Sequence, residues 1–183
     1  YENLTFEEAL KIAQDNGYAE KDPTADVEGI DACRKISILS SLASNSWIDP
    51  EKVHTEGITH ITLEDVAYAG NCECVIKLIS TMEKLDDGRY YIVVSPAIVS
   101  KESQLAAIDG VFNGALVSGD NVGDVVFYGQ GAGKLATASA VVGDIVDCAN
   151  HDANRRKIGW NEENKDLVAD YREVPNRYYI RLK

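Results

Sequence analysis

The stretch from Glu20 to Lys35 reads E-K-D-P-T-A-D-V-E-G-I-D-A-C-R-K and contains five carboxylates. Asp31 and Lys35 are four residues apart, so on a helix they stand one above the other. Carboxylates beside a lysine can hold an ammonium group and move a proton. We therefore predict a functional site in this stretch.

The backbone of the stretch should turn and then enter a helix. Pro23 pushes Asp22 out of the helical region, and Asp26 is a suitable N-cap for a helix over about residues 27–44. That helix is apolar on two sides, formed by Ile30, Cys33, Ile36 and Leu39 and by Ile38 and Leu42. A helix that is apolar on both sides is usually buried, so we expect the aspartate–lysine pair to project from a buried helix.

Two other interpretations of the acidic stretch remain open. A run of charges is commonly a solvated face. Alternating oxygen-bearing residues between Asp22 and Glu28 also resemble a calcium loop. However, Val27 is at the sixth position, where such a loop has glycine, and Cys33 is at the twelfth, where it has glutamate.

Composition limits the class of protein. The chain has 183 residues, enough for one domain with a substantial core, and 45% of them are hydrophobic. A formal net charge of −12 argues against nucleic-acid and anionic-membrane partners. No apolar run approaches the ~20 residues of a membrane-spanning helix, and no leader is visible. We expect a cytoplasmic protein with reduced cysteines and no metal site, because Cys72 and Cys74 are too close for a zinc knuckle and the histidines are scattered.

The remaining elements predict an α+β fold. A capping box formed by Thr5 and Glu8 opens a first helix, and Gly17 ends it. Thr62 and Asp65 cap a short helix that runs to about Tyr68. Extended segments are expected at residues 74–84, 89–95, 111–118 and 124–128, a helical turn at residues 101–107, and a last helix at residues 135–150. Since Asp87-Gly88 is a strong hairpin signal, we expect a mixed, mainly antiparallel sheet with helices on one face.

A glycine loop, G-Q-G-A-G-K at residues 129–134, lies between the last strand and the last helix. Loop amides and a helix N-terminus suit a phosphate. The loop is not a Walker A motif, because Leu135 stands where serine or threonine would bind magnesium, and it is not G-x-G-x-x-G. A tight turn that binds nothing is the alternative.

The C-terminal part differs in composition. Residues 151–174 are charged and lack periodicity, which predicts a linker. Residues 175–183 end in R-Y-Y-I-R-L-K, which is typical of a first strand whose partners are absent. We therefore divide the chain into a region 1–150, a linker and the start of a further domain.

Long motifs of this chain resemble homoserine dehydrogenases. They follow the family's order and spacing from about Phe6 to Asn150. The motifs are G-Y-A-E-K-D-P-T-A-D-V-E-G-I-D-A-C-R-K (residues 17–35), E-G-I (56–58) with Ile61, S-P-A-I-V-S-K-E-S-Q-L-A (95–106), D-G-V-F-N (109–113) and Y-G-Q-G-A-G-K-L-A-T-A-S-A-V-V-G-D (128–144).

The resemblance implies a function and a set of roles. The reaction is the interconversion of aspartate semialdehyde and homoserine with NADP or NAD, on the route to threonine and methionine. Glu20 and Asp26 would bind the substrate's polar groups. Asp31 and Lys35 would lie at the reacting carbonyl, with Lys35 as proton donor. The cofactor would contact residues of the glycine loop and the helix after it, namely Gly131, Ala132, Gly133 and Thr137.

The chain also departs from the family pattern. Family members begin with a Rossmann domain that carries G-x-G-x-x-G, which this chain does not contain, and Ala136 replaces a usual proline. The tail resembles the entry to a C-terminal ACT domain. The resemblance thus implies a catalytic and dimerisation region that forms a homodimer through its sheet. The alternative is a non-catalytic dimerisation fragment that cannot bind cofactor on its own.

Overall fold

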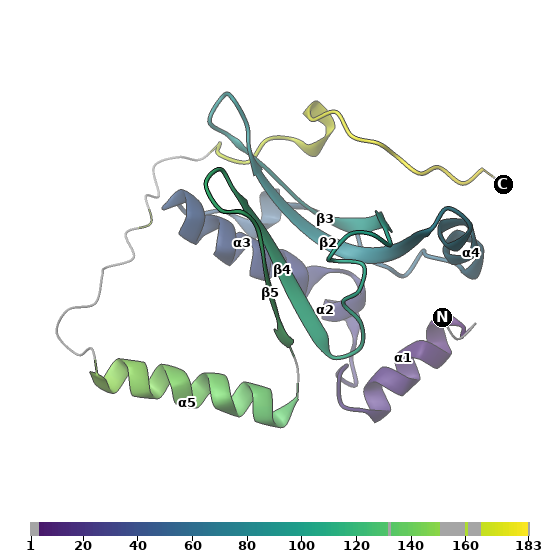
Figure 1. The fold of residues 1–183 in the computed structure, drawn as a ribbon, viewed down its shortest axis with the longest axis horizontal. Coiled ribbons are helices and arrows are strands. Elements are labelled where there is room, and N and C mark those ends of the chain that lie inside the picture. The colour runs from purple at the N-terminus through teal and green to yellow at the C-terminus, as the bar shows by residue number, and fades with distance from the viewer. Residues whose placement is uncertain (1–3, 132, 151–159, 161–165, 183) are drawn as a thin grey trace. The chain divides into compact units, whose positions relative to one another are not determined.

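The computed structural model describes residues 4–131, 133–150, 160 and 166–182 (Figure 1). The chain folds into two compact units. Unit 1 comprises residues 1–21, 67–75 and 99–157, and unit 2 comprises residues 22–66, 76–98 and 158–183. The chain passes between the units within three elements, which are α4 (Leu63–Asn71), β2 (Cys74–Lys84) and β3 (Tyr90–Ser100).

Unit 2 is built on a three-stranded sheet in the order β1-β3-β2. The short β1 (His54–Thr55) follows η1 (Pro50–Lys52) and runs parallel to β3, pairing His54 with Val93 and Thr55 with Val94. The β2–β3 hairpin closes where the Leu85 amide donates to the Arg89 carbonyl at 2.8 Å. Gly88 in this turn has a φ of 87°, which explains why the turn has glycine there.

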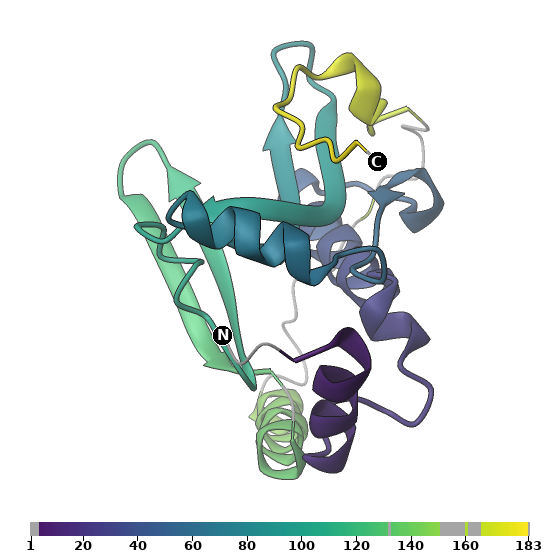
Figure 2. The ribbon, with the colours of Figure 1, turned by 90° about the vertical axis from the view of Figure 1, so that its right-hand side faces the viewer.

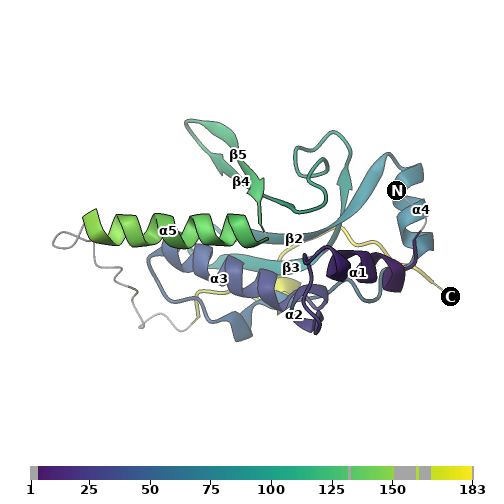
Figure 3. The ribbon, with the colours of Figure 1, turned by 90° about the horizontal axis from the view of Figure 1, so that it is seen from below.

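Helix α3 (Ile30–Ser44) packs on the central strand of this sheet (Figure 3). Four consecutive residues of β3, Tyr91 to Val94, are buried. The apolar core combines residues from α3, from β3 and from the segment that joins α3 to β1, namely Cys33, Ile36, Ile48, Val53, Ile92 and Val94. Burial of each such aliphatic side chain contributes about 1.5–3 kcal/mol, so this cluster fixes α3 to the sheet.

The C-terminal segment, residues 166–182, also belongs to unit 2 and runs beside the β2–β3 hairpin (Figure 2, yellow). It pairs with the start of β3: the Tyr90 amide donates to the Leu167 carbonyl at 2.7 Å, and the Ala169 amide donates to the Tyr90 carbonyl at 2.9 Å. Ala169 is 3% exposed. The described part of the predicted linker therefore packs on the sheet.

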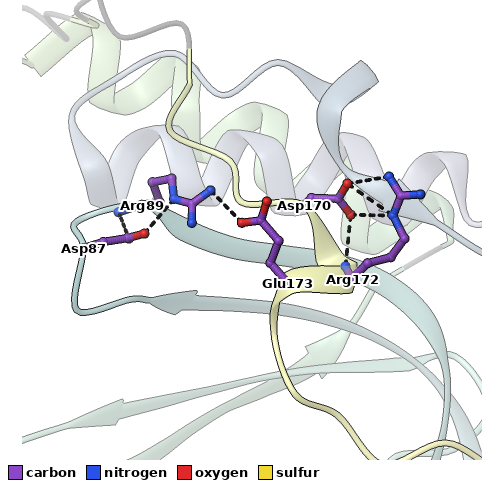
Figure 4. A network of polar contacts seen from close by, with 5 residues as sticks. All are labelled: Asp87, Arg89, Asp170, Arg172 and Glu173. Atoms are coloured by element: carbon purple, nitrogen blue, oxygen red, sulfur yellow. Dashed lines mark hydrogen bonds and ion pairs between the residues drawn. The ribbon is translucent and has the colours of Figure 1, made fainter.

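Polar contacts tie the same segment to the hairpin (Figure 4). Arg89 bridges two carboxylates, Asp87 at 2.7 Å and Glu173 of η2 (Tyr171–Glu173) at 2.9 Å. Side-chain and backbone hydrogen bonds from Arg172 lower the pKa of Asp170 to about 2. Further along, the Asn176 side chain donates to the Tyr91 hydroxyl at 2.9 Å.

Unit 1 contains α1 (Phe6–Asp15), the β4–β5 hairpin and α5 (Lys134–Asn150). The predicted capping box between Thr5 and Glu8 is present. Strands β4 (Phe112–Gly119) and β5 (Gly123–Gln130) pair antiparallel along their whole length. The end of α4 is joined to the end of β3 by an ion pair between Glu73 and Lys101 at 2.9 Å.

The predicted class is confirmed: the fold is α+β with mostly antiparallel strands. Several predicted boundaries are wrong. The helix expected over residues 27–44 ends at Ser44 as predicted but begins at Ile30, because Gly29 takes a left-handed φ of 74° and separates it from the short α2 (Thr24–Val27). Strand β3 continues through Pro96. Among the described residues β1 pairs only with Val93 and Val94, so β3 has an open edge at Pro96, where proline is tolerated.

Residues 101–107 form single hydrogen-bonded turns, in which the Ser103 amide donates to the Ser100 carbonyl at 2.9 Å and the Ala106 amide to the Ser103 carbonyl at 3.0 Å. Residues 175–182 pair with no strand among the described residues and bind through side chains, as described below. The expectation that they begin a further domain stays a prediction.

Candidate active site

Lys35 and Asp31 form an ion pair on α3, with 2.6 Å between Nζ and Oδ2. The Lys35 side chain is 59% exposed and that of Asp31 is 43% exposed. The expectation of a buried helix is thus wrong for this chain, since Ile38 and Leu42, on the same side of α3, are half exposed. An ion pair this exposed contributes at most about 1 kcal/mol to stability, and its lysine is accessible to a ligand.

The opposite side of α3 explains how the pair is held. That side is buried through Cys33 and Ile36 and through the small hydroxyls of Ser37, Ser40 and Ser41. The Ser41 hydroxyl accepts a hydrogen bond from the Ile48 amide at 3.0 Å and donates to the Ser37 carbonyl at 2.7 Å. One face of α3 is therefore fixed to unit 2 while the other presents Asp31 and Lys35.

Residues 22–31, which include α2 and the first two residues of α3, form what we call the acidic corner. Asp22 accepts hydrogen bonds from the hydroxyl of Thr24 at 2.6 Å and from its amide at 3.1 Å, and these lower the pKa of Asp22. Asp26 lies exposed in the single turn of α2. It does not cap the long helix as predicted, because Gly29 stands at the N-cap of α3.

Glu20, the other predicted substrate ligand, belongs to unit 1. Its side chain is exposed, and its carbonyl accepts a hydrogen bond from the Gln14 side chain at 2.9 Å. Asp26 on α2 and the pair of Asp31 and Lys35 on α3 thus belong to unit 2, while Glu20 follows α1 in unit 1.

The predicted glycine loop connects β5 to α5 in unit 1. Gly131 donates its amide to the Val111 carbonyl at 3.0 Å, and Gly133 has a φ of 105°, which favours glycine. The Thr137 amide donates to the Gly133 carbonyl at 3.1 Å, so Thr137 lies one turn into the helix. Ala132 lies outside the described residues.

This loop fits a phosphate-bearing cofactor. The first amides of a helix lack partners within that helix, and α5 is 17 residues long, so its N-terminus favours an anion. A Cβ on Gly131 would lie 1.9 Å from the Asn113 amide nitrogen, which explains glycine at this position. Gly131, Gly133 and Thr137 could therefore hold a dinucleotide.

One polar cluster was not predicted. Asp65, at the start of α4, is 4% exposed and accepts hydrogen bonds from Thr62, from the Tyr179 hydroxyl at 2.9 Å and from Arg181 at 2.5 Å. Arg181 also donates to the Thr62 hydroxyl. Alternation in Y-Y-I-R could have indicated this, because Tyr179 and Arg181 fall on one side of an extended segment.

Burial alone would raise the pKa of Asp65, but the hydrogen bonds from Thr62 and Tyr179 and the charge of Arg181 outweigh it and lower the pKa. In the part of the chain that the structure describes, no three histidine, cysteine or acidic side chains are grouped to hold a metal. No described helix is both long and apolar enough to cross a membrane.

Solved dehydrogenases share this fold. A crystal structure of a homoserine dehydrogenase from Thiobacillus denitrificans has a TM-score of 0.80 and 36% identity, covering 92% of this chain and 40% of that one. A hyperthermophilic archaeal homoserine dehydrogenase in complex with NADPH has a TM-score of 0.65 and 30% identity, covering 85% of this chain and 43% of that one.

Sequence comparison gives the family. The homoserine dehydrogenase family model matches residues 1–146, so the chain belongs to the homoserine dehydrogenase family. The homoserine dehydrogenase of Synechocystis sp. is 44% identical over 149 residues, which are 80% of this chain and 34% of that protein. The chain thus spans between a third and a half of the length of these relatives.

Proposed function

We propose that this chain is the substrate-binding part of a homoserine dehydrogenase. The complete enzyme would reversibly reduce L-aspartate 4-semialdehyde to L-homoserine with NAD(P)H, in the biosynthesis of threonine and methionine. The observation that carries this proposal is the accessible pair of Lys35 and Asp31, 2.6 Å apart, in a chain of this family. The pair is exposed on a helix face, so its lysine and carboxylate are accessible to a substrate.

The four predicted side chains, Glu20, Asp26, Asp31 and Lys35, have complementary roles in this proposal. The semialdehyde carries an ammonium group, which the carboxylates of Asp26 and Glu20 would bind. Asp31 would hold the Lys35 ammonium group directed at the carbonyl oxygen. Lys35 would then protonate the oxygen as it becomes an alkoxide, and in the reverse direction would take the hydroxyl proton. The ion pair supports the role of Asp31 in directing Lys35, because Lys35 Nζ lies within hydrogen-bond distance of Asp31 Oδ2.

The cofactor would be held by the glycine loop and the start of α5, through Gly131, Ala132, Gly133 and Thr137. When bound, the nicotinamide supplies the hydride that reduces the carbonyl carbon. The N-terminus of the 17-residue α5 supports this placement, because its first amides lack partners within the helix and favour an anion. We propose NADP or NAD as the cofactor.

We also propose a cytoplasmic homodimer that associates through the sheet. The β4–β5 hairpin exposes apolar side chains, including Val117 at 54% and Phe127 at 64%. Apolar side chains grouped on one hairpin favour contact with another protein surface. In the proposed enzyme that surface would be the second subunit.

The reaction is tested by steady-state assay of the complete enzyme that contains this chain. We expect NADPH oxidation that depends on L-aspartate 4-semialdehyde, and a large loss of turnover in Asp31→Asn. The control is Asp86→Asn, an exposed acid of the β2–β3 turn, which should change nothing. Absence of semialdehyde-dependent oxidation in the unaltered enzyme would refute the proposed function.

The alternative function is a dimerisation fragment without catalysis of its own. It is favoured by the short span of the chain, which covers 34% of the Synechocystis relative. Titration of this chain with NADPH, followed by nucleotide fluorescence, separates the two possibilities. Saturable binding by the isolated chain would exclude the alternative.

A further inference from the structure

The segment after β1 passes directly against the acidic corner, all within unit 2. The Ile58 amide donates to the Val27 carbonyl at 2.8 Å. Beside that bond, a Cβ on Gly57 would lie 2.3 Å from the Val27 carbonyl oxygen and 2.5 Å from the Glu28 Cα. Gly57 is buried, and both atoms that it faces belong to the main chain, so no side-chain rotation could make room.

The other end of this segment is fixed to the sheet. The Glu56 amide donates to the Val94 carbonyl at 2.8 Å, and Thr55 pairs with Val94 in β1. Val94 is fully buried in the core that holds α3. The segment therefore cannot retreat from the corner without breaking its pairing with β3.

The acidic corner is also closely packed at Gly29, which faces Thr55 and Val94. Gly29 has a φ of 74°, and a Cβ there would lie 3.3 Å from Thr55 Cγ2 and from Val94 Cγ1. Val27 ends α2, and Glu28 and Gly29 are the whole connection to α3. A displacement of Val27 and Glu28 would thus move Asp26 on α2 relative to Asp31 and Lys35 on α3.

We propose that Gly57 is a positioning residue for the reaction. Because Gly57 has no side chain, the segment 55–58 can pack directly against the main chain of the acidic corner. We infer that this packing fixes the separation between Asp26 and the Asp31–Lys35 pair. This inference rests on the proposed function, because it takes Asp26 as a ligand of the substrate. A Cβ contact under 3.0 Å is essentially never observed, so a methyl group at position 57 must displace the corner by roughly half an ångström or more.

The first test is Gly57→Ala in the complete enzyme. Misplacement of a substrate-binding group by about 1 Å can cost up to 100-fold in rate. We expect kcat/KM for L-aspartate 4-semialdehyde to fall about 10- to 100-fold, while the KM for NADPH stays within about twofold, since the glycine loop belongs to unit 1. The matched control is Gly70→Ala, where a Cβ meets nothing within 4 Å.

A glycine needed only for stability would give a different result. It would lower the melting temperature and reduce the fraction of active enzyme, with unchanged KM values. Equal losses of kcat/KM for the semialdehyde and for NADPH would therefore overturn the proposal. If Gly57→Ala fails to fold, Gly29→Ala replaces it. Its Cβ would lie 3.3 Å from Thr55 and Val94, and alanine at a φ of 74° adds backbone strain in the same corner. The same selective loss is expected of it.

A double-mutant cycle with Asp26→Asn shows whether Gly57 acts through Asp26. In the Asp26→Asn background we expect Gly57→Ala to lower kcat/KM for the semialdehyde by less than about threefold. An undiminished loss there, with Asp26→Asn itself impaired, would overturn the inference and leave the proposed function standing. Full activity of Asp26→Asn would instead refute the proposed role of Asp26, and the inference with it.

Discussion

Arg181 reaches the buried carboxylate of Asp65, 116 residues earlier in the chain, with 2.5 Å between Nη1 and Oδ2. The side chain of Asp65 is 5% exposed and that of Arg181 is 34% exposed, so the pair is shielded mainly on the aspartate side. Tyr179 donates to the second oxygen of Asp65. The C-terminal segment is therefore fixed to the start of α4 by a nearly buried charge.

Arg181→Ala should destabilise unit 2. The change leaves Asp65 buried with its Thr62 and Tyr179 hydrogen bonds but without a counter-charge. A lost hydrogen bond to a buried charged group costs about 1–3 kcal/mol, and we expect the free energy of unfolding to fall by that amount. Urea denaturation followed by circular dichroism measures it. Arg177→Ala, an exposed arginine of the same segment, is the control and should stay within about 0.5 kcal/mol.

The Asp65 cluster should also make stability depend on pH in the acid range. The folded state lowers the pKa of Asp65 below its usual value, so the unfolded state binds its proton first as the pH falls. The contribution of Asp65 is complete above the unfolded pKa and is lost as the pH falls through the folded pKa. When the free energy of unfolding is measured from neutral pH downward, its decrease at acidic pH should be smaller in Asp65→Asn than in the unaltered chain. Identical acid profiles would contradict the prediction.

Lys35→Ala should abolish most turnover of the complete enzyme. General acid catalysis by a positioned side chain contributes about 10²–10⁴-fold, and we expect kcat to fall by a factor in that range. Since Lys35 is exposed, the variant should fold and keep its melting temperature. Steady-state kinetics with L-aspartate 4-semialdehyde measure the loss, and Arg34→Ala on the same helix is the control. Near-normal turnover of Lys35→Ala would mean that another group donates the proton.

The sequence predicts those features that arise from local chemistry. The capping box of Thr5 and Glu8 forms as expected, and β2 has the expected bounds. The helix break at Gly29 was missed, because a glycine after a good N-cap such as Asp26 is ambiguous in sequence. In the fold, a side chain at position 29 would meet Thr55 and Val94, which are distant in sequence.

In the candidate site too, local features were predicted from the sequence and contacts between distant segments were not. The spacing of Asp31 and Lys35 predicted their ion pair, since it depends on one helix turn. Their exposure was not predicted, because the apolar residues Ile38 and Leu42 indicated burial that this chain does not provide. The docking of Tyr179 and Arg181 on Asp65 was missed, since it joins segments more than 100 residues apart.

Gly131→Ala should weaken cofactor binding, and a second change should restore it. A Cβ at position 131 would lie 1.9 Å from the Asn113 side-chain nitrogen, so the amide of Asn113 must rotate away from its place beside the loop. An unfavourable rotamer costs about 0.5–1.5 kcal/mol, which corresponds to a rise of about two- to tenfold in the KM for NADPH. Steady-state kinetics of the complete enzyme measure this rise.

The restoring change is Asn113→Ala, which removes the obstructing amide. In the Gly131→Ala background it should return the KM for NADPH to within about twofold of the unaltered value, because the added methyl group then has room. Gly119→Ala, in the β4–β5 turn where a Cβ meets nothing within 4 Å, is the control and should leave the KM unchanged. A KM that stays high in the double variant would show that Gly131 is needed for direct approach of the cofactor to the backbone and not for its fit against Asn113.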